Sequence, residues 1–261
     1  MITELLDFSG RVAIVTGGGT GIGYATASQL SRLGASLVIA SRGAEELERA
    51  AASLREESGN PVLAVPTDVK DEEAVIRLVA RTVEEFGRID VLVNNAGGTR
   101  LGPLEQIPTR GWDSIFDLNA KSAYIATREA GRHMIAQKSG AIVNISSSSG
   151  MTGIRGGAHY ASAKSALQMF TKITAAEWGK HGIRANCVAA GMIASPRAVD
   201  AWNVANLNPM EMARTIPARR PGTPEEMANA IVFLASDAAS YISGQTFAVN
   251  GGPALGGIPD D

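Results

Sequence analysis

The sequence of 261 residues has a single cysteine, Cys187, and only three histidines. One cysteine excludes an intrachain disulfide. Its apolar surroundings, IRANCVAA, indicate a small buried side chain rather than a nucleophile. His133, His159 and His181 stand in no metal-ligand spacing with Cys, Asp or Glu. We therefore expect neither a disulfide framework nor a bound metal.

Long hydrophobic runs and an excess of one charge are also lacking. No stretch of about 18 apolar residues is present, so we expect no membrane-spanning helix. The first residues, MITELLDFSG, do not resemble a signal peptide, and a reducing cytoplasm is the expected location. Lys plus Arg number 24 and Asp plus Glu 26, a net charge of −2. Nothing here predicts a surface for nucleic acid or anionic lipid; a small molecule is the expected partner.

Glycine and aliphatic residues, in contrast, are plentiful, and short β-branched runs alternate with helical patterns. The expected strands are 11–16, 36–40, 62–66, 90–95, 141–146, 183–188 and 246–250. The expected helices are 21–33, 44–58, 71–86, 109–137, 159–180 and 224–236. The strand segments are almost continuously apolar, which is typical of a parallel sheet buried on both faces. We predict an α/β fold: a single Rossmann-type, doubly wound parallel sheet of about seven strands with helices on both faces.

One interval, 191–222, departs from this rhythm. It contains four prolines and several apolar side chains, and we expect an irregular insert that forms a substrate loop or packs on the domain or a neighbouring subunit. No linker or low-complexity segment is found, so residues 1–261 are expected to form one domain. The helix after the insert has a strong start, because Thr223 and Glu226 can form a capping box around Pro224.

A glycine-rich segment, TGGGTGIG, joins the first expected strand to the first expected helix. Gly17, Gly21 and Gly23 allow a tight turn and close backbone approach, and the helix start offers free N–H groups to a pyrophosphate. We expect a dinucleotide here, with Thr20 and Ile22 also in contact. The alternative is a glycine-rich turn that binds no ligand.

The end of the second expected strand, VIASRG, favours NADP over NAD. NAD-binding folds usually place an acid about 20 residues after the glycines, whereas this sequence has Ser41 and Arg42. A hydroxyl and a guanidinium suit a 2′-phosphate, although Arg42 can also be an ordinary surface residue. After the third strand, Asp68 and Val69 are expected near the adenine, and Asp68 can instead, or in addition, cap the helix near Asp71.

Five motifs in order resemble the short-chain dehydrogenase/reductase family. They are TGGGTGIG, NNAG (94–97), Asn119 in DLNAKSAY, the serine run ISSSSG and YASAK, and they cover nearly the whole chain. The resemblance implies a catalytic tetrad of Asn119, Ser147, Tyr160 and Lys164. It also implies a homotetramer whose subunits meet through 109–137 and 159–180.

The chemistry of these residues agrees with reduction of a carbonyl. Tyr160 can donate the proton that the reduced oxygen needs, and Lys164, one helical turn away, is expected to favour the phenolate and hold the nicotinamide ribose. Ser147 is expected to donate a hydrogen bond to the substrate oxygen. Asn119 is expected to anchor a water that leads from Lys164 to solvent.

The resemblance places further residues around the nicotinamide. Asn95, Ala96 and Gly97 are expected near its ribose, and Gly191, Ile193 and Ser195 follow the sixth strand beside the carboxamide. One departure is Ala190, because the family commonly has Pro-Gly where this sequence has Ala-Gly. Loss of the proline is expected to loosen this loop.

Segments such as SPRAVDAW are similar to the branch that contains peroxisomal trans-2-enoyl-CoA reductase and 2,4-dienoyl-CoA reductase. The resulting hypothesis is an NADPH-dependent reductase acting on a 3-oxoacyl thioester, carried by CoA or a carrier protein. Enoyl-CoA reduction and an NAD(P)-dependent dehydrogenase of a small secondary alcohol, sugar or steroid are alternatives. A non-catalytic NADP-binding regulator is a third, which the intact tetrad disfavours.

Overall fold

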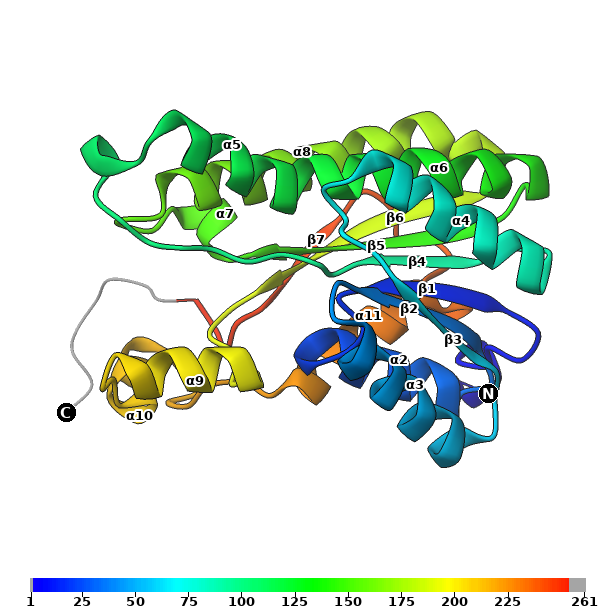
Figure 1. Cartoon of the computed structure of the whole chain (residues 1–261), viewed down its shortest axis with the longest axis horizontal. Helices are drawn as coiled ribbons and strands as arrows, with labels where there is room; N and C mark the ends of the chain where they lie inside the picture. Colours follow the sequence, from blue (N-terminus) through cyan, green and yellow to red (C-terminus); the bar gives the residue numbers. More distant parts are fainter. Residues whose placement is uncertain (1, 254–261) are drawn as a thin grey trace.

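A parallel sheet of seven strands forms the centre of the computed structural model, which describes residues 2–253 (Figure 1). The strands are β1 Val12–Thr16, β2 Ser36–Ser41, β3 Val62–Pro66, β4 Val91–Asn94, β5 Gly140–Ser147, β6 Ile183–Ala190 and β7 Thr246–Val249. Their order is β3-β2-β1-β4-β5-β6-β7, with every neighbouring pair parallel. The order reverses between β1 and β4, so the doubly wound, Rossmann-type α/β fold is confirmed.

Helices cover both faces of this sheet (Figure 1). One face carries α2 Gly21–Arg32, α3 Ala44–Ser58 and α11 Pro224–Ala235. The other carries α4 Glu72–Phe86, α5 Thr109–Phe116, α6 Ser122–Gln137 and α8 Ala158–Trp178. Four short helices are α1 Ile2–Leu5, α7 Ser149–Thr152, α9 Pro196–Val204 and α10 Pro209–Met212. None of the helices in the described part of the chain is long and apolar enough to cross a bilayer.

The strands bury both of their faces, as their apolar runs predict. In β1, Ala13 and Val15 pack toward α2 and α11, whereas Ile14 packs toward α4 and α6. All five residues of β1 are buried. Burial of apolar surface contributes roughly 25 cal/mol per Å², so this two-sided core holds the strand ends, where the site lies, in fixed positions.

The helix expected over 109–137 is interrupted, which corrects the sequence prediction. A π-helical turn, Asp117–Lys121, separates α5 from α6 and contains the buried Asn119. Single π-helical turns often occur at functional sites, because the widened turn redirects one side chain. The apolar periodicity continues through the turn and therefore gives no sign of it.

The irregular insert expected at 191–222 contains two helices, so that expectation is wrong in part. Ser195 accepts a hydrogen bond from Ala198 N at the start of α9, and Asn208 accepts one from Met210 N at the start of α10. The prolines that follow these caps, Pro196 and Pro209, stand at the first helical turn, where a missing N–H costs nothing. Figure 1 shows α9 and α10 at the end of the molecule that also holds α5 and α7.

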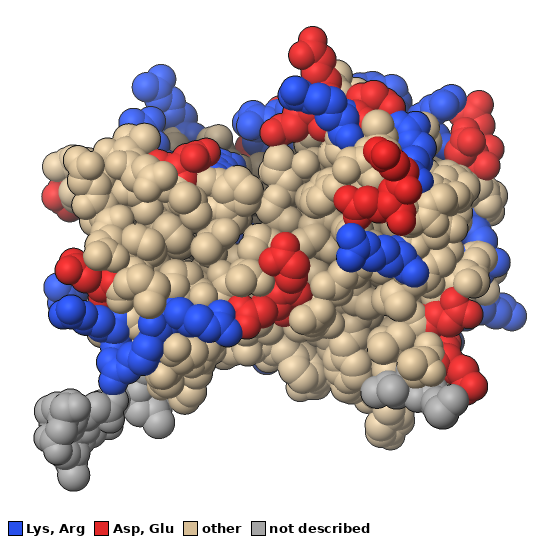
Figure 2. All heavy atoms as spheres, turned by 90° about the horizontal axis from the view of Figure 1, so that it is seen from below, with Lys and Arg blue, Asp and Glu red and all other residues tan. Residues whose placement is uncertain are grey.

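The capping box predicted for α11 is present, with Thr223 Oγ1 accepting from Glu226 N and Glu226 accepting from Thr223 N. On the face drawn in Figure 2, basic and acidic side chains are interspersed. That face therefore offers no continuous basic surface.

Candidate active site

The glycine-rich segment forms a tight cradle at the carboxyl end of β1. Gly17 and Gly21 have φ of +66° and +55°, which favour glycine. A methyl group on Gly23 would lie 2.1 Å from the carbonyl oxygen of Gly17 and 2.6 Å from Nδ2 of Asn95. The backbone at Gly23 therefore packs directly against the backbone at Gly17, with no space for a side chain. The start of α2, from Thr20 through Ile22, presents N–H groups that have no intrahelical acceptor.

Thr16, which sequence reasoning missed, ties this cradle to the NNAG segment. Its hydroxyl accepts from the N–H groups of Asn95 and Ala96 at 3.0 and 3.1 Å. Asn95 in turn donates from Nδ2 to the carbonyl oxygens of Thr16 and Gly17 at 2.9 and 3.2 Å. The threonine that ends β1, directly before the glycines, is the sequence signal that would have indicated it.

Ser41 ends β2 beside the cradle, and its hydroxyl is buried without a hydrogen-bond partner among the described residues. A methyl group on Gly19 would lie 3.5 Å from this oxygen, so the hydroxyl faces the glycine-rich segment. Arg42 follows it, is exposed, and makes no hydrogen bond or ion pair within residues 2–253. A buried hydroxyl left without a partner is costly, and an anionic ligand at this position would satisfy both groups.

At the end of β3, Asp68 and Asp71 have separate tasks. Asp71 caps α4 by accepting from Glu73 N, whereas Asp68 accepts from Lys70 N at 3.0 Å in the preceding turn. The expectation that Asp68 can cap the helix is therefore wrong. Val69 is buried among the residues packed under α4.

Tyr160 and Ser147 approach each other across the groove between α8 and β5. Ser147 Oγ accepts from Ser149 N at 3.1 Å, and its hydroxyl acts to lower the pKa of the Tyr160 phenol. Burial is the larger effect, so the pKa of the phenol lies above its ordinary value. Tyr160 therefore stays protonated at neutral pH, as a proton donor must.

The prediction that Lys164 lowers the pKa of Tyr160 is wrong for this structure. Lys164 Nζ donates to the carbonyl oxygen of Ile145 at 2.7 Å and lies 5.8 Å from the centre of the Tyr160 ring. Its own pKa falls to about 8, chiefly because burial disfavours the ammonium, although Cys187 opposes the shift. Burial is the largest cause of the pKa shift at both groups, and neither is among the causes of the other's shift. The deep position of Cys187 confirms that it is a buried structural residue.

Asn119 joins the tetrad through the loop that follows β4. A methyl group on Gly97 would lie 2.9 Å from Asn119 Oδ1 and 3.2 Å from Lys164 Nζ, so Gly97 separates the two side chains. Asn119 also accepts from Gly98 N at 3.1 Å and donates to Gly98 O at 2.8 Å and Ile115 O at 3.0 Å. One of its donors therefore holds the loop and the other bonds α5. The expected water remains a prediction, with the free lone pair of Oδ1 as its anchor.

Ser146 and Gln168 position the tetrad and were not expected to do so. Ser146 donates to the backbone oxygen of Lys164 at 2.9 Å, and Gln168 donates to Ser146 Oγ at 2.9 Å and to the backbone oxygen of Ser147 at 3.2 Å. Gly150 fits against α8 because a methyl group there would lie 2.8 Å from the backbone of Lys164. These contacts fix the distance between β5 and α8.

The loop after β6 keeps its course without the expected proline. Gly191 N donates to Val249 O at 2.9 Å, and Ser148 N donates to Ala190 O at 2.9 Å. Ile193 pairs with Gly222 in an isolated bridge, and a methyl group on Gly21 would lie 3.3 Å from Ser195 Cβ. These bonds use the oxygen of Ala190 and the N–H of Gly191, which a proline at position 190 would also leave in place. The looser loop therefore stays a prediction.

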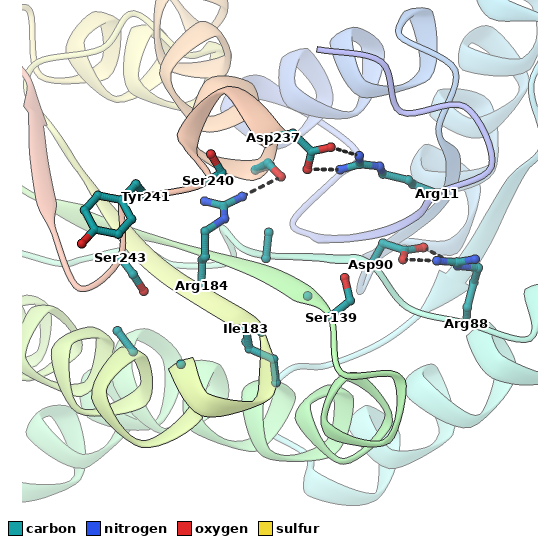
Figure 3. Close-up of a pocket in the computed structure, with 16 residues that line it drawn as sticks. Arg11, Arg88, Asp90, Ser139, Ile183, Arg184, Asp237, Ser240, Tyr241 and Ser243 are labelled. Carbon is teal, nitrogen blue, oxygen red and sulfur yellow. Dashed lines mark hydrogen bonds and ion pairs between the residues drawn. The ribbon is translucent and has the colours of Figure 1, made fainter. Parts of the chain in front are cut away.

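A hollow of about 670 Å³ lies at the opposite, amino-terminal edge of the sheet (Figure 3). Its charged side chains are paired within the chain: Arg11 with Asp237, and Arg88 with Asp90. Arg184 donates to the backbone oxygens at the end of α11, including Leu234 O at 2.7 Å. These bonds give the three arginines a structural role. The hollow lies at the edge of the sheet opposite to the tetrad.

The residues at the carboxyl edge fit a nicotinamide dinucleotide. The glycine cradle excludes side chains where a pyrophosphate would lie, and the unpartnered Ser41 hydroxyl stands at the ribose end. Ser147 ends β5, beside Tyr160 and Lys164 of α8, and the point where the sheet order reverses, between β1 and β4, lies between these residues and Ser41. Within residues 2–253, no group of three or more His, Cys, Asp or Glu side chains can hold a metal.

Known proteins are similar to this chain in sequence and in fold. A family described as enoyl-(acyl carrier protein) reductase matches residues 17–253. A 3-oxoacyl-[acyl-carrier-protein] reductase from Synechocystis is 40% identical, with 93% of this chain and 96% of that protein covered. A peroxisomal 2,4-dienoyl-CoA reductase from Danio rerio is 34% identical, over 94% of this chain and 81% of that protein, which agrees with the resemblance read from the sequence.

Among solved structures, L-sorbose reductase from Gluconobacter frateurii, complexed with NADPH and L-sorbose, superposes with a TM-score of 0.91. It is 34% identical, with 95% of this chain and 97% of that chain covered. The glycine cradle and the tetrad both lie within the residues that these similarities cover. This protein therefore belongs to the short-chain dehydrogenase/reductase family of NAD(P)-dependent oxidoreductases.

Proposed function

We propose that this protein is an NADPH-dependent reductase of a 3-oxoacyl thioester, in which Tyr160 donates the proton. The observation that carries the proposal is the meeting of Lys164 and Asn119 across Gly97, with Ser147 near enough to the Tyr160 phenol to influence its pKa. The 40% identity with a 3-oxoacyl-[acyl-carrier-protein] reductase supports the substrate class. Residues 1–261 act as one NADP-binding domain, with 191–222 as its substrate loop.

Each member of the tetrad has a task set by its surroundings. The nicotinamide, when bound, supplies the hydride. Ser147 and Tyr160 both donate hydrogen bonds to the carbonyl oxygen, and the Tyr160 proton passes to it as negative charge develops. Lys164 binds the nicotinamide ribose and then restores the proton to Tyr160, because a buried amine with a pKa of about 8 exchanges protons readily near neutral pH. Asn119 keeps Gly97 and Gly98 in place between these groups.

The cofactor residues divide by position. We place the adenine beside Asp68 and Val69, and the 2′-phosphate beside Ser41 and Arg42, which favours NADP over NAD. The pyrophosphate lies on the glycine cradle, in contact with Gly17, Thr20, Gly21, Ile22 and Gly23. The nicotinamide half is assigned to Asn95, Ala96, Gly97, Tyr160, Lys164, Gly191, Ile193 and Ser195.

Exposed apolar side chains around the mouth of the crevice support a substrate with an acyl chain. Leu101 and Ile154 stand on two loops that touch, because Gly102 N donates to Gly156 O at 2.8 Å. Met151 on α7 and Leu207 after α9 are also exposed. Flexible methionine and leucine side chains adapt to irregular hydrocarbon chains, so this rim suits a thioester better than a sugar.

A sugar or small-alcohol dehydrogenase is the second candidate, since the sorbose reductase has the same fold and similar coverage.

For the assembly we propose a homotetramer. The exposed apolar residues of α6 and α8, Tyr124, Met169 and Ile173, form its contact surface. Leu167 and Trp178 of the same helix pack inside the chain instead. We place the protein in the cytoplasm.

A substrate panel tests the function. Acetoacetyl-CoA, crotonyl-CoA and L-sorbose are offered with NADPH and with NADH, and cofactor oxidation is followed at equal enzyme concentration. We expect turnover of acetoacetyl-CoA with NADPH, with crotonyl-CoA and sorbose at least about 100-fold slower in kcat/KM. Faster reduction of sorbose than of acetoacetyl-CoA would instead establish the second candidate.

A further inference from the structure

Arg197, in the first turn of α9, lies next to the tetrad and has no assigned role. Two guanidinium nitrogens would be 3.2 and 3.3 Å from a methyl group on Gly98. Gly98 is the residue that Asn119 holds by both its N–H and its C=O. A methyl group on Gly97, the residue directly before it, would lie 3.2 Å from Lys164 Nζ. Because adjacent Cα atoms are about 3.8 Å apart, the guanidinium lies beside the loop segment that also borders Lys164 and Asn119.

The position of Arg197 is fixed at its base. The residue before Pro196, Ser195, caps α9 and lies against Gly21 of the cradle. Ile193 is tied to Gly222 by two backbone hydrogen bonds around it, Ala194 N to Gly222 O at 2.8 Å and Gly222 N to Met192 O at 2.9 Å. The arginine therefore projects from an anchored turn toward the tetrad.

No hydrogen bond or ion pair of Arg197 is found within residues 2–253, although a guanidinium has five donors. Arg197 is exposed, and other exposed arginines among the described residues, such as Arg49 and Arg110, are unpaired as well. Arg197 differs from them in its place, because its guanidinium lies against Gly98. Gly98 leaves space for the guanidinium, because a side chain there would occupy that place. An unpaired planar cation at the entrance is suited to two parallel hydrogen bonds with a carboxylate.

We propose that Arg197 binds a carboxylate on the substrate, so that the natural substrate is an oxo compound with a free carboxylate a few bonds from the reacting carbonyl. This inference rests on the proposed function, since it places the carbonyl at the tetrad. A half-thioester of a dicarboxylic acid with a 3-oxo group has both the carbonyl that the tetrad reduces and the carboxylate that Arg197 binds. The phosphates of a CoA or carrier arm are more than ten bonds from the carbonyl, whereas Arg197 lies against Gly98, which Asn119 of the tetrad holds.

The test is a binding measurement on the NADP⁺-loaded protein. Isothermal titration compares 4-oxocyclohexanecarboxylate with 4-oxocyclohexanecarboxamide, and 4-oxopentanoate with 4-oxopentanamide. We expect the carboxylate of at least one pair to bind about tenfold or more tightly than its amide. In Arg197→Ala this preference disappears, and in Arg197→Lys it is reduced, because lysine keeps the charge but not the planar fork.

Two controls make the outcome specific. Arg81→Ala removes the same charge from α4, where Arg81 is paired with Glu84 on the surface, and should keep the preference. Tyr160→Phe should also keep the preference for the carboxylate. Because the measurement is of binding, it is independent of turnover, whose failure would refute the proposed function. Equal binding of carboxylate and amide, no binding of either, or a preference that survives in Arg197→Ala would overturn the inference. A weaker Kd for NADPH in Arg197→Ala with unchanged preference would assign Arg197 to the cofactor instead.

Discussion

At the scale of single residues, burial decides the protonation of the site. Lys164 and Cys187 lie close together under the tetrad, and burial shifts their pKa values in opposite directions, to about 8 and about 11. In both cases the neutral form is favoured. Tyr160 is likewise kept neutral, since burial raises its pKa. The site therefore contains a protonated donor in Tyr160 and, in Lys164, an ammonium that loses its proton near pH 8.

Lys164→Met should stabilise the fold at neutral pH. The lysine pKa is lowered from 10.5 to about 8, so at pH 7 the folded chain carries a disfavoured buried ammonium, worth up to about 3 kcal/mol. Between pH 8 and 10.5 the unfolded chain binds the proton that the folded chain releases, and wild-type stability rises with pH relative to the variant. Urea unfolding of both proteins at pH 7 and pH 10 measures this. A difference that does not shrink at pH 10 would show that burial of the charge is not its cause.

Arg42→Ala tests the cofactor preference. If Arg42 binds the 2′-phosphate, its removal costs a charge-assisted hydrogen bond, so the Kd for NADPH should rise by about 10- to 100-fold. The Kd for NADH should change by less than about threefold. Fluorescence titration with both cofactors measures the two values, and Ser41→Ala should weaken NADPH binding in the same sense. Equal losses for NADPH and NADH would remove the 2′-phosphate assignment.

At the scale of elements, the strands, the cradle and the long helices could be predicted, but the turns between them could not. Apolar runs and glycine spacing depend on local sequence. The π-helical turn at Asn119 depends on hydrogen bonds to Gly98, a residue distant in sequence, and no periodicity records it. The prolines of 191–222 favour an irregular segment in the sequence pattern, although Ser195-Pro196 and Asn208-Pro209 are also suited to helix starts. The tetrad was predictable from its motifs, whereas Arg197 was not, because its place depends on how α9 docks on the β4 loop.

Gly23→Ala tests the cradle as an element. The added methyl group would lie 2.1 Å from the Gly17 oxygen, so either the start of α2 or the turn before it must move. We expect a loss of about 1–3 kcal/mol in unfolding free energy and a rise in the NADPH Kd of at least about tenfold. Gly179→Ala is the matched control, because no atom lies within 4 Å of the added group, and it should change stability by less than about 0.5 kcal/mol. A fully stable Gly23→Ala protein that binds NADPH normally would contradict this description of the cradle.

At the scale of the whole molecule, the two edges of the sheet differ in purpose. At the carboxyl edge, Ser41, Arg42 and Arg197 have no hydrogen-bond or ion-pair partner among the described residues. At the amino edge, Arg11, Arg88 and Arg184 are bonded within the chain (Figure 3). The carboxyl edge is therefore suited to binding a ligand, whereas the amino edge stabilises the fold.

The proposed homotetramer gives a prediction at this scale. Ile173 on α8 is 49% exposed and stands with Met169 and Tyr124 in the contact surface. Ile173→Asp would bury a charge in that contact, so native mass spectrometry should show dimers or monomers in place of tetramers. Leu5→Asp, on the exposed α1, is the control and should leave the mass unchanged. A wild-type protein that is monomeric at micromolar concentration would refute the assembly.

The most direct test of the central claim is a single turnover of acetoacetyl-CoA with enzyme-bound NADPH, at pH 7, in wild type and Tyr160→Phe. The variant keeps the ring, which packs beside Lys164, and loses only the donor that Ser147 holds. We predict an unchanged Kd for NADPH and a rate of NADPH oxidation reduced by about 100-fold or more, since general acid catalysis contributes on the order of 10²–10⁴. A variant that reduces the thioester at the wild-type rate would show that Tyr160 is not the proton donor.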